Sequence, residues 1–232
     1  MMFLQLAIVV QTYYWPIYFQ SVKGNTAKES GIYTLPFVIS STLSTLTVGW
    51  VISKVGYYVP FMWAGAPILA IGGGLYQLIS LDSPTAEWIG YQIVSGVGYG
   101  ICTQIPLLSV QVTLCKEDVP TGCVVVLFFQ ALGGALGTSI AQNLFTDKLL
   151  KKLQEVSGID GAAIVAAGAK DFRQVTPPEL LDQVIDAFGT GLKDVFWLAV
   201  ASAIVAILIS TVMEWGRVPK DNEQSAVDGA SA

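Results

Sequence analysis

The sequence predicts an all-α integral membrane protein whose helices form a six-helix bundle. Only 12% of the 232 residues are charged and 53% are hydrophobic, whereas about 25% of the residues in a typical soluble domain are charged. The charged residues also fall in clusters, which leaves six uncharged stretches of 19 to 28 residues. A helix needs about 20 apolar residues to cross a bilayer, and a segment in hydrocarbon must satisfy its backbone hydrogen bonds internally. Each stretch is therefore expected to cross the membrane as a helix.

The composition also excludes several classes of function. The low charge content excludes a chain that is disordered as a whole, a basic nucleic-acid-binding domain and an ordinary soluble enzyme. The chain contains no histidine, which excludes HExxH metal sites and histidine-based catalytic triads or dyads within it. Its three cysteines show no pairing pattern. We therefore expect membrane lipid as a partner, and no nucleic acid, metal, cofactor or catalytic residue.

The uncharged stretches define the expected organisation of the chain. Five transmembrane helices are predicted within residues 1–145, over 1–20, 31–52, 60–80, 88–113 and 119–145, and a sixth over 192–213. Residues 146–191 form a charged loop with two amphipathic helical patterns, which are expected either to lie on the membrane surface or to pack as a small cap. Residues 214–232 are polar and predict a disordered tail. Because the first helix starts at the initiator methionine, we interpret the chain as part of a larger protein.

Glutamine is the recurring polar residue of the predicted spans, because no charged residue lies deep in any of them. An amide that faced lipid without a partner would cost some kcal/mol, so these side chains should point to other helices or to a wet cavity. Two interpretations stay open, namely contacts that hold the helices together and a polar, aromatic lining for an amphipathic ligand. The candidate lining residues are Gln11, Tyr14, Tyr18, Gln104, Gln111 and Gln130.

Prolines and glycines inside the spans predict kinks and close helix contacts. Pro16 and Pro106 each remove a backbone hydrogen bond and can bend or hinge their helices. Two pairs of glycines have the GxxxG spacing, which lets helix backbones approach closely. The pairs are Gly96 with Gly100 and Gly133 with Gly137.

Three stretches resemble the second half of major facilitator superfamily transporters, in the fourteen-span drug:proton antiporter branch that is common among fungal efflux pumps. They are YYWPIYFQSVKG (Tyr13–Gly24), WIGYQIVSGVGYGICTQIPLLSVQ (Trp88–Gln111) and DVPTGCVVVLFFQALGGALGTSIAQNLF (Asp118–Phe145). The resemblance implies that the bundle is one half of a major facilitator fold. It also implies proton-driven export of an amphipathic drug, toxin or secondary metabolite by alternating access.

The resemblance carries further expectations about orientation and partners. It places both ends of the chain in the cytoplasm and the loop 146–191 outside, in the plasma membrane or in the vacuolar membrane. It implies that the first and fourth helices line a central cavity, that the second and fifth flank it, and that the third and sixth face lipid. Substrate sites in this fold lie between two halves, so a missing N-terminal half is an expected partner, and protons are expected to act mainly through it.

Two other interpretations of the sequence stay open. A six-span carrier could act as a homodimer and form its second half from a copy of itself. Alternatively, the chain is a membrane scaffold or remnant that transports nothing.

Overall fold

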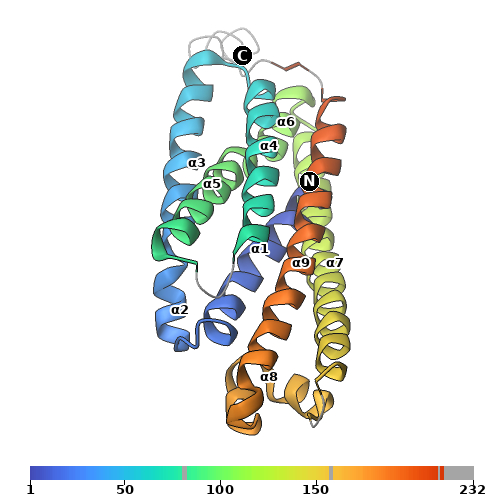
Figure 1. Cartoon of the computed structure of the whole chain (residues 1–232). Helices are drawn as coiled ribbons and strands as arrows, with labels where there is room; N and C mark the ends of the chain where they lie inside the picture. Colours follow the sequence, from blue (N-terminus) through green and yellow to red (C-terminus); the bar gives the residue numbers. More distant parts are fainter. Residues whose placement is uncertain (80–82, 157–158, 214, 217–232) are drawn as a thin grey trace, which may run out of the picture.

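The computed structural model describes residues 1–79, 83–156, 159–213 and 215–216. These residues form an elongated bundle in which helices run along the long axis and α8 lies at one end (Figure 1). No strand element occurs in the described ranges. The α-helices are α1 (Met2–Ser21), α2 (Ala27–Tyr33), α3 (Leu35–Val55), α4 (Val59–Leu75), α5 (Thr85–Cys102), α6 (Ile105–Thr113), α7 (Val119–Gln154), α8 (Gly161–Val175) and α9 (Leu181–Ser210), with 3₁₀ turns η1 (Tyr76–Leu78) and η2 (Pro178–Leu180).

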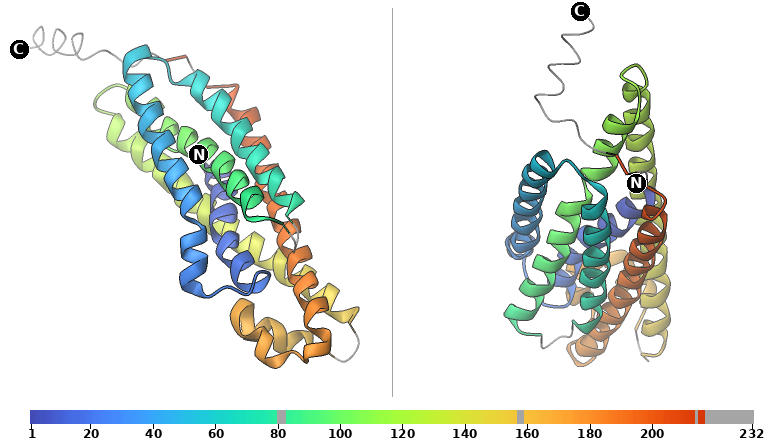
Figure 2. Two further views of the ribbon diagram at one scale, coloured as in Figure 1. Left: turned by 60° about the vertical axis from the view of Figure 1, so that its left-hand side comes forward. Right: turned by 90° about the horizontal axis from the view of Figure 1, so that it is seen from above.

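The helices pack as two related sets of three. Helices α3 and α4 both pack along α5, whereas α7 and α9 both pack along α1. Contact between α4 and α9 joins the two sets, and the view from above shows α4 and α5 between α3 on one side and α9 on the other (Figure 2). Exchanging α1 with α5, α3 with α7 and α4 with α9 reproduces these contacts, whereas the contact between α7 and α9 has no counterpart of similar extent between the described residues of α3 and α4. Such packing is typical of repeats nested within one half of a transporter.

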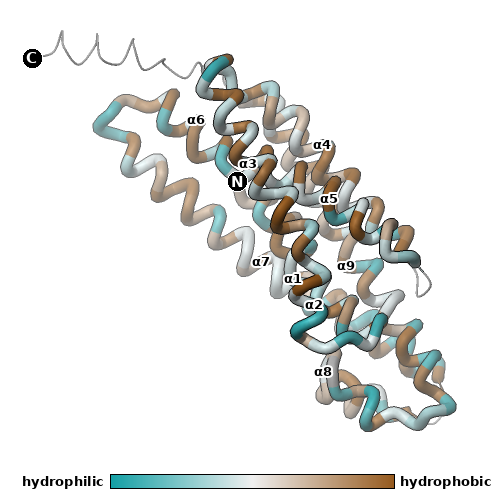
Figure 3. Tube along the Cα trace, turned by 90° about the vertical axis from the view of Figure 1, so that its left-hand side faces the viewer, coloured by the Kyte–Doolittle hydropathy of each residue, from teal (hydrophilic) through white to brown (hydrophobic). Residues whose placement is uncertain are grey.

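Five helical segments are long and apolar enough to cross a membrane. They are Ala27–Val55, Val59–Leu78, Thr85–Thr113, Val119–Gln154 and Pro178–Ser210. The first predicted span, α1, is not among them by this measure, since Gln5, Gln11 and several aromatic residues lower its hydropathy. Hydrophobic residues extend along α3, α4 and α5, and hydrophilic residues gather near α2 and α8 (Figure 3). Five of the six predicted spans therefore contain helices that are long and apolar enough to cross a membrane, and the crossing by α1 stays a prediction.

The predicted span 88–113 is two helices rather than one. Helix α5 ends at Cys102 and α6 begins at Ile105, with Thr103 and Gln104 between them. Pro106 lies in the first turn of α6, where its missing N–H costs nothing, whereas in a continuous helix its ring would meet the carbonyl of Cys102. The predicted span, in which a bend was expected at Pro106, is therefore divided into α5 and α6.

The loop expected over 146–191 is mostly helical. Helix α7 continues to Gln154 and α9 begins already at Leu181, so both helices run past the ends predicted for them. The extensions bury an apolar stripe that includes Leu149, Leu153 and Val184, and a helix whose apolar face is covered can continue into a charged region. The charged residues of 146–191 therefore do not coincide with the end of α7 or the start of α9. Of the expected tail 214–232, only Trp215 and Gly216 lie within the described residues.

Helix α8 packs onto the bundle as a cap. Its Phe172 is fully buried and stacks on Phe188 of α9 with ring centroids 4.5 Å apart. The Arg173 guanidinium donates hydrogen bonds to the carbonyl oxygens of Ser21 (2.9 Å) and Val22 (3.4 Å) at the end of α1. A cation that meets the last carbonyls of a helix stabilises it. Helix α8 thus packs against α1 and α9; whether it also lies on the membrane surface, and whether it is extracellular, stay predictions.

Candidate functional site

Helix α1 has one buried face and one accessible face. Gln11, Tyr14 and Tyr18 are all buried, with at most 4% of each residue exposed. Tyr13, in contrast, is 51% exposed. The accessible face borders an open hollow of about 450 Å³ that is lined by Val9, Thr12, Tyr13, Pro16 and Ile17.

Gln11 joins three helices in the interior of the bundle. Its side-chain oxygen accepts a hydrogen bond from the Ser95 hydroxyl of α5, and its amide nitrogen lies over Gly73 of α4. The amide nitrogen has no hydrogen-bond partner among the described residues, and neither does the buried hydroxyl of Tyr76. Gln11 thus matches the interpretation of a contact that holds helices together.

We expect Gln11→Leu to lower the free energy of unfolding only slightly, by about 0.6–1.7 kcal/mol, the range for polar contacts between membrane helices. Ser95 can then donate its hydrogen bond within its own helix, as serines in helices do. Thr12→Val is the matched control on the accessible face of α1, where Thr12 is exposed. Unfolding in detergent, followed by tryptophan fluorescence, measures both variants. A loss well above this range for Gln11→Leu would contradict the contact described here.

Tyr14 and Gln130 lie in the contact between α1 and α7. The Tyr14 hydroxyl donates to the Gln142 side-chain oxygen over 3.4 Å, and the Gln130 amide donates to the Gln5 side-chain oxygen over 3.4 Å. Both distances are at the long end for hydrogen bonds, so each contributes little to the free energy of folding. Gln130 remains half-buried, at the edge of the accessible α1 face.

Gln104 and Gln111 are brought together in a second hollow, of about 280 Å³, between α3 and the broken helix α5–α6. Both side chains are exposed. Gln104 is the residue that precedes α6, so the break between the helices sets its position. Thr45 also lines this hollow and ties α3 to α5 by donating to the Gly100 carbonyl over 3.0 Å.

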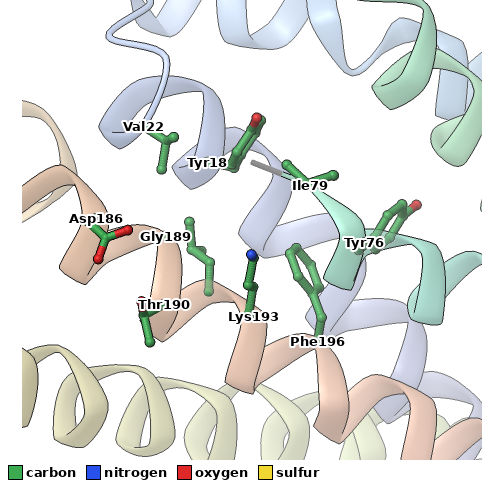
Figure 4. A pocket seen from close by; sticks show the side chains of 10 residues that line it. Tyr18, Val22, Tyr76, Ile79, Asp186, Gly189, Thr190, Lys193 and Phe196 are labelled. Atoms are coloured by element: carbon green, nitrogen blue, oxygen red, sulfur yellow. The ribbon is translucent and has the colours of Figure 1, made fainter. Parts of the chain in front are cut away.

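Tyr18 lines a third cavity, with Tyr76 and Phe196, on the other side of α1 (Figure 4). The six residues expected to line one cavity are therefore not gathered in one place. Only Gln104 and Gln111 share a hollow. Thr12 and Tyr13 of the accessible face were not among the predicted lining residues. Neighbouring residues in a helix point about 100° apart, so a buried face with Gln11 and Tyr14 would have indicated that Thr12 and Tyr13 lie toward the other side.

The GxxxG glycines lie at close contacts between helices. A methyl group at Gly96 would lie 2.6 Å from the Phe37 carbonyl oxygen of α3. A methyl group at Gly137 would lie 3.2 Å from the Cα atom of Leu6 in α1. Gly100 and Gly133 approach the backbones of α3 and α1 as closely. Pro16 lies inside α1 and borders the accessible hollow. A hinge motion at Pro16 or Pro106 stays a prediction.

Known transporters align with nearly the whole chain. It is 57% identical over 224 residues to an MFS-type transporter of Aspergillus luteorubrus, an alignment that covers 97% of this chain and 41% of that protein. It is 38% identical over 203 residues to the rubrofusarin-specific efflux pump of Gibberella zeae, covering 88% of this chain and 37% of the pump. An efflux pump of Aspergillus parasiticus is 35% identical over 221 residues, which cover 94% of this chain and 43% of that protein.

These relatives are named as transporters or efflux pumps and not as enzymes. No protein-family model matches the chain. The chain spans about two fifths of the length of the curated relatives it matches. Together with five long apolar helices, the alignments make the chain a multi-pass integral membrane protein. It belongs to the major facilitator superfamily of transporters, and its span and helical bundle are consistent with the C-terminal half of an efflux pump of that family.

Proposed function

We propose that this chain is the C-terminal half of a plasma-membrane exporter of the fourteen-span drug:proton antiporter branch. The complete transporter would export amphipathic organic compounds by proton-coupled alternating access. The observation that carries the proposal is the accessible face of α1, where Thr12 and Tyr13 lie among apolar side chains, in a chain whose relatives are named efflux pumps. This face would form one wall of the substrate cavity, and the N-terminal half would form the other.

The exposure of α3 and α7 supports a missing partner half. Only 17% of the most apolar window of Ala27–Val55 and 11% of that of Val119–Gln154 is buried, against 39–44% in the other three segments. Helix α7 presents Val124, Leu127 and Phe128 to its surroundings. In the proposed transporter, parts of these two helices pack against the other half on either side of the cavity, and the remaining surface faces lipid.

Substrate contacts are assigned by accessibility. Thr12 and Tyr13 would contact the substrate from α1, and Gln104 and Gln111 would contact it from the hollow beside α6. Between them, these residues would offer an aromatic ring, hydroxyls and amides, which suit a ligand with both apolar and polar parts. No acidic residue lies deep in the predicted spans, which supports proton handling mainly by the other half.

A chimera tests the proposal. This chain replaces the 203 aligned residues of the rubrofusarin-specific efflux pump, and rubrofusarin efflux is measured in cells that lack that pump. We expect efflux that stops when a protonophore dissipates the proton gradient. A chimera that reaches the plasma membrane at the level of the parent pump, yet exports no rubrofusarin, would overturn the proposal.

Within this chimera we expect Tyr13→Ala to raise the KM for rubrofusarin. Tyr57→Ala is the matched control, since Tyr57 is 42% exposed but lies in the connection between α3 and α4. Equal kinetics for the two variants would show that the accessible face of α1 does not contact the substrate.

A further inference from the structure

A cavity of about 200 Å³ lies where the end of α1, the turn η1 and helix α9 meet. Tyr18 lines it from α1, whereas Tyr13 and Ile17 line the hollow on the accessible face of the same helix. Tyr18 is five positions after Tyr13, which places them about 140° apart around a helix that turns 100° per residue. The two cavities are therefore separate, and the α1–α9 cavity has no part in the proposed substrate path.

Aromatic rings form a rigid wall of the α1–α9 cavity. The rings of Tyr76 and Phe196 pack with centroids 5.1 Å apart, and Trp15 packs edge-on against Tyr76 at 4.7 Å. Tyr18, Tyr76 and Phe196 are each at least 96% buried. A wall built from packed aromatic rings is preorganised, so a ligand that binds against it orders few side chains.

A lysine that has no counterion among the described residues faces this wall. The Lys193 side chain points into the cavity toward Tyr18 and Ile79 (Figure 4). Its amine makes no hydrogen bond or ion pair within the described ranges, and its backbone carbonyl is fixed by a 2.7 Å hydrogen bond from the Gln77 amide. The neighbouring Asp194 is paired with Lys148 at 2.6 Å, so it does not neutralise Lys193.

Two other polar residues of α9 border the cavity. Thr190 lies one turn before Lys193 and can donate a hydroxyl hydrogen bond. Asp186 lies two turns before Lys193, at the far end of the cavity and exposed to solvent. Seven residues of helix correspond to a rise of about 10 Å, and Asp186 forms no ion pair with Lys193 among the described residues.

We infer that this cavity binds the anionic head group of an amphiphile. Lys193 and Thr190 would hold a phosphate or carboxylate, and the adjoining apolar part would lie against Tyr76 and Phe196. Two observations point to this ligand together: the Lys193 amine has no partner in the part of the chain that the structure describes, and the preformed wall beside it is aromatic. A lysine that only reached for the membrane surface would need no such wall.

Binding to the purified chain in neutral detergent tests this inference, independently of export. Dodecyl phosphate is added stepwise to the purified chain, and two quantities are recorded: the tryptophan fluorescence, to which the buried Trp15 contributes, and the midpoint of thermal unfolding. We expect saturable binding that inorganic phosphate and dodecyl maltoside do not reproduce. Lys193→Gln should weaken binding about tenfold, since it removes one charge-assisted hydrogen bond.

Matched controls separate the outcomes. Lys151→Gln removes a cation that is exposed and paired with Asp147 on α7, and it should bind dodecyl phosphate like the parent chain. Lysophosphatidic acid and 2-naphthoate then distinguish a lipid head group from a small aromatic anion as the preferred ligand. Equal affinity of the parent chain and Lys193→Gln, or binding of dodecyl maltoside as tight as that of dodecyl phosphate, would overturn the inference.

Discussion

Gly96→Ala is expected to lower the free energy of unfolding by about 2–3 kcal/mol, in the upper range for overpacked sites. The added methyl group would lie 2.6 Å from the Phe37 carbonyl oxygen and would overlap the Ser40 hydroxyl. The Ser40 side chain can rotate, but Phe37 contributes backbone, which moves only if α3 shifts as a whole. The contact between α3 and α5 is among the most extensive in the bundle, so such a shift separates many packed atoms.

Gly90→Ala is the matched control for this prediction. Gly90 lies in the same helix, and a methyl group there would have no neighbour within 4 Å. Its replacement should be neutral or stabilise α5 by about 0.5–1 kcal/mol, because glycine disfavours a helix. Reversible unfolding in mixed micelles measures both variants. Equal stability of the two would mean that α3 and α5 do not pack at Gly96 as described.

The glycine spacing predicted close contacts but not the helices that make them. Gly96 and Gly100 contact α3, whereas Gly133 and Gly137 contact α1. Gly98 lies between Gly96 and Gly100 in the sequence but does not belong to that pair, and it faces the backbone of Leu69 in α4. A small residue allows an approach from any helix, so the partner depends on the arrangement of the whole bundle, which local spacing does not contain.

The positions of the helices could be predicted better than their ends and their rotation. Uncharged stretches located each apolar span because charge is costly in lipid. Helix α7 extends past residue 145, the end predicted for it, because Leu153 is buried in a cluster with residues of α8 and α9. The local charge pattern contains no information about packing against segments that are distant in sequence. The rotation of α1 could not be predicted either, because the Gln11 side chain is buried and its oxygen accepts a hydrogen bond from Ser95.

The chain on its own is expected to catalyse no proton-linked transport. Reconstituted in vesicles with an imposed pH gradient, it should accumulate no rubrofusarin, because one wall of a cavity does not bind and release a substrate alternately. The remaining N-terminal part of the rubrofusarin-specific pump, expressed as a separate polypeptide, should restore efflux in cells. Wild-type pump and the N-terminal part alone are the two controls.

This split experiment separates the three interpretations of the chain. Complementation requires the partner half to cover the exposed apolar side of α7, where Phe128 is 61% and Val124 is 65% exposed. Replacing both with lysine should abolish complementation, because a buried unpaired charge is costly at an interface. Uphill transport by the chain alone, with a stable dimer by native mass measurement, would instead establish a homodimeric carrier. A chain that reaches the membrane but neither transports nor complements would be a scaffold, and the exporter assignment would then be wrong.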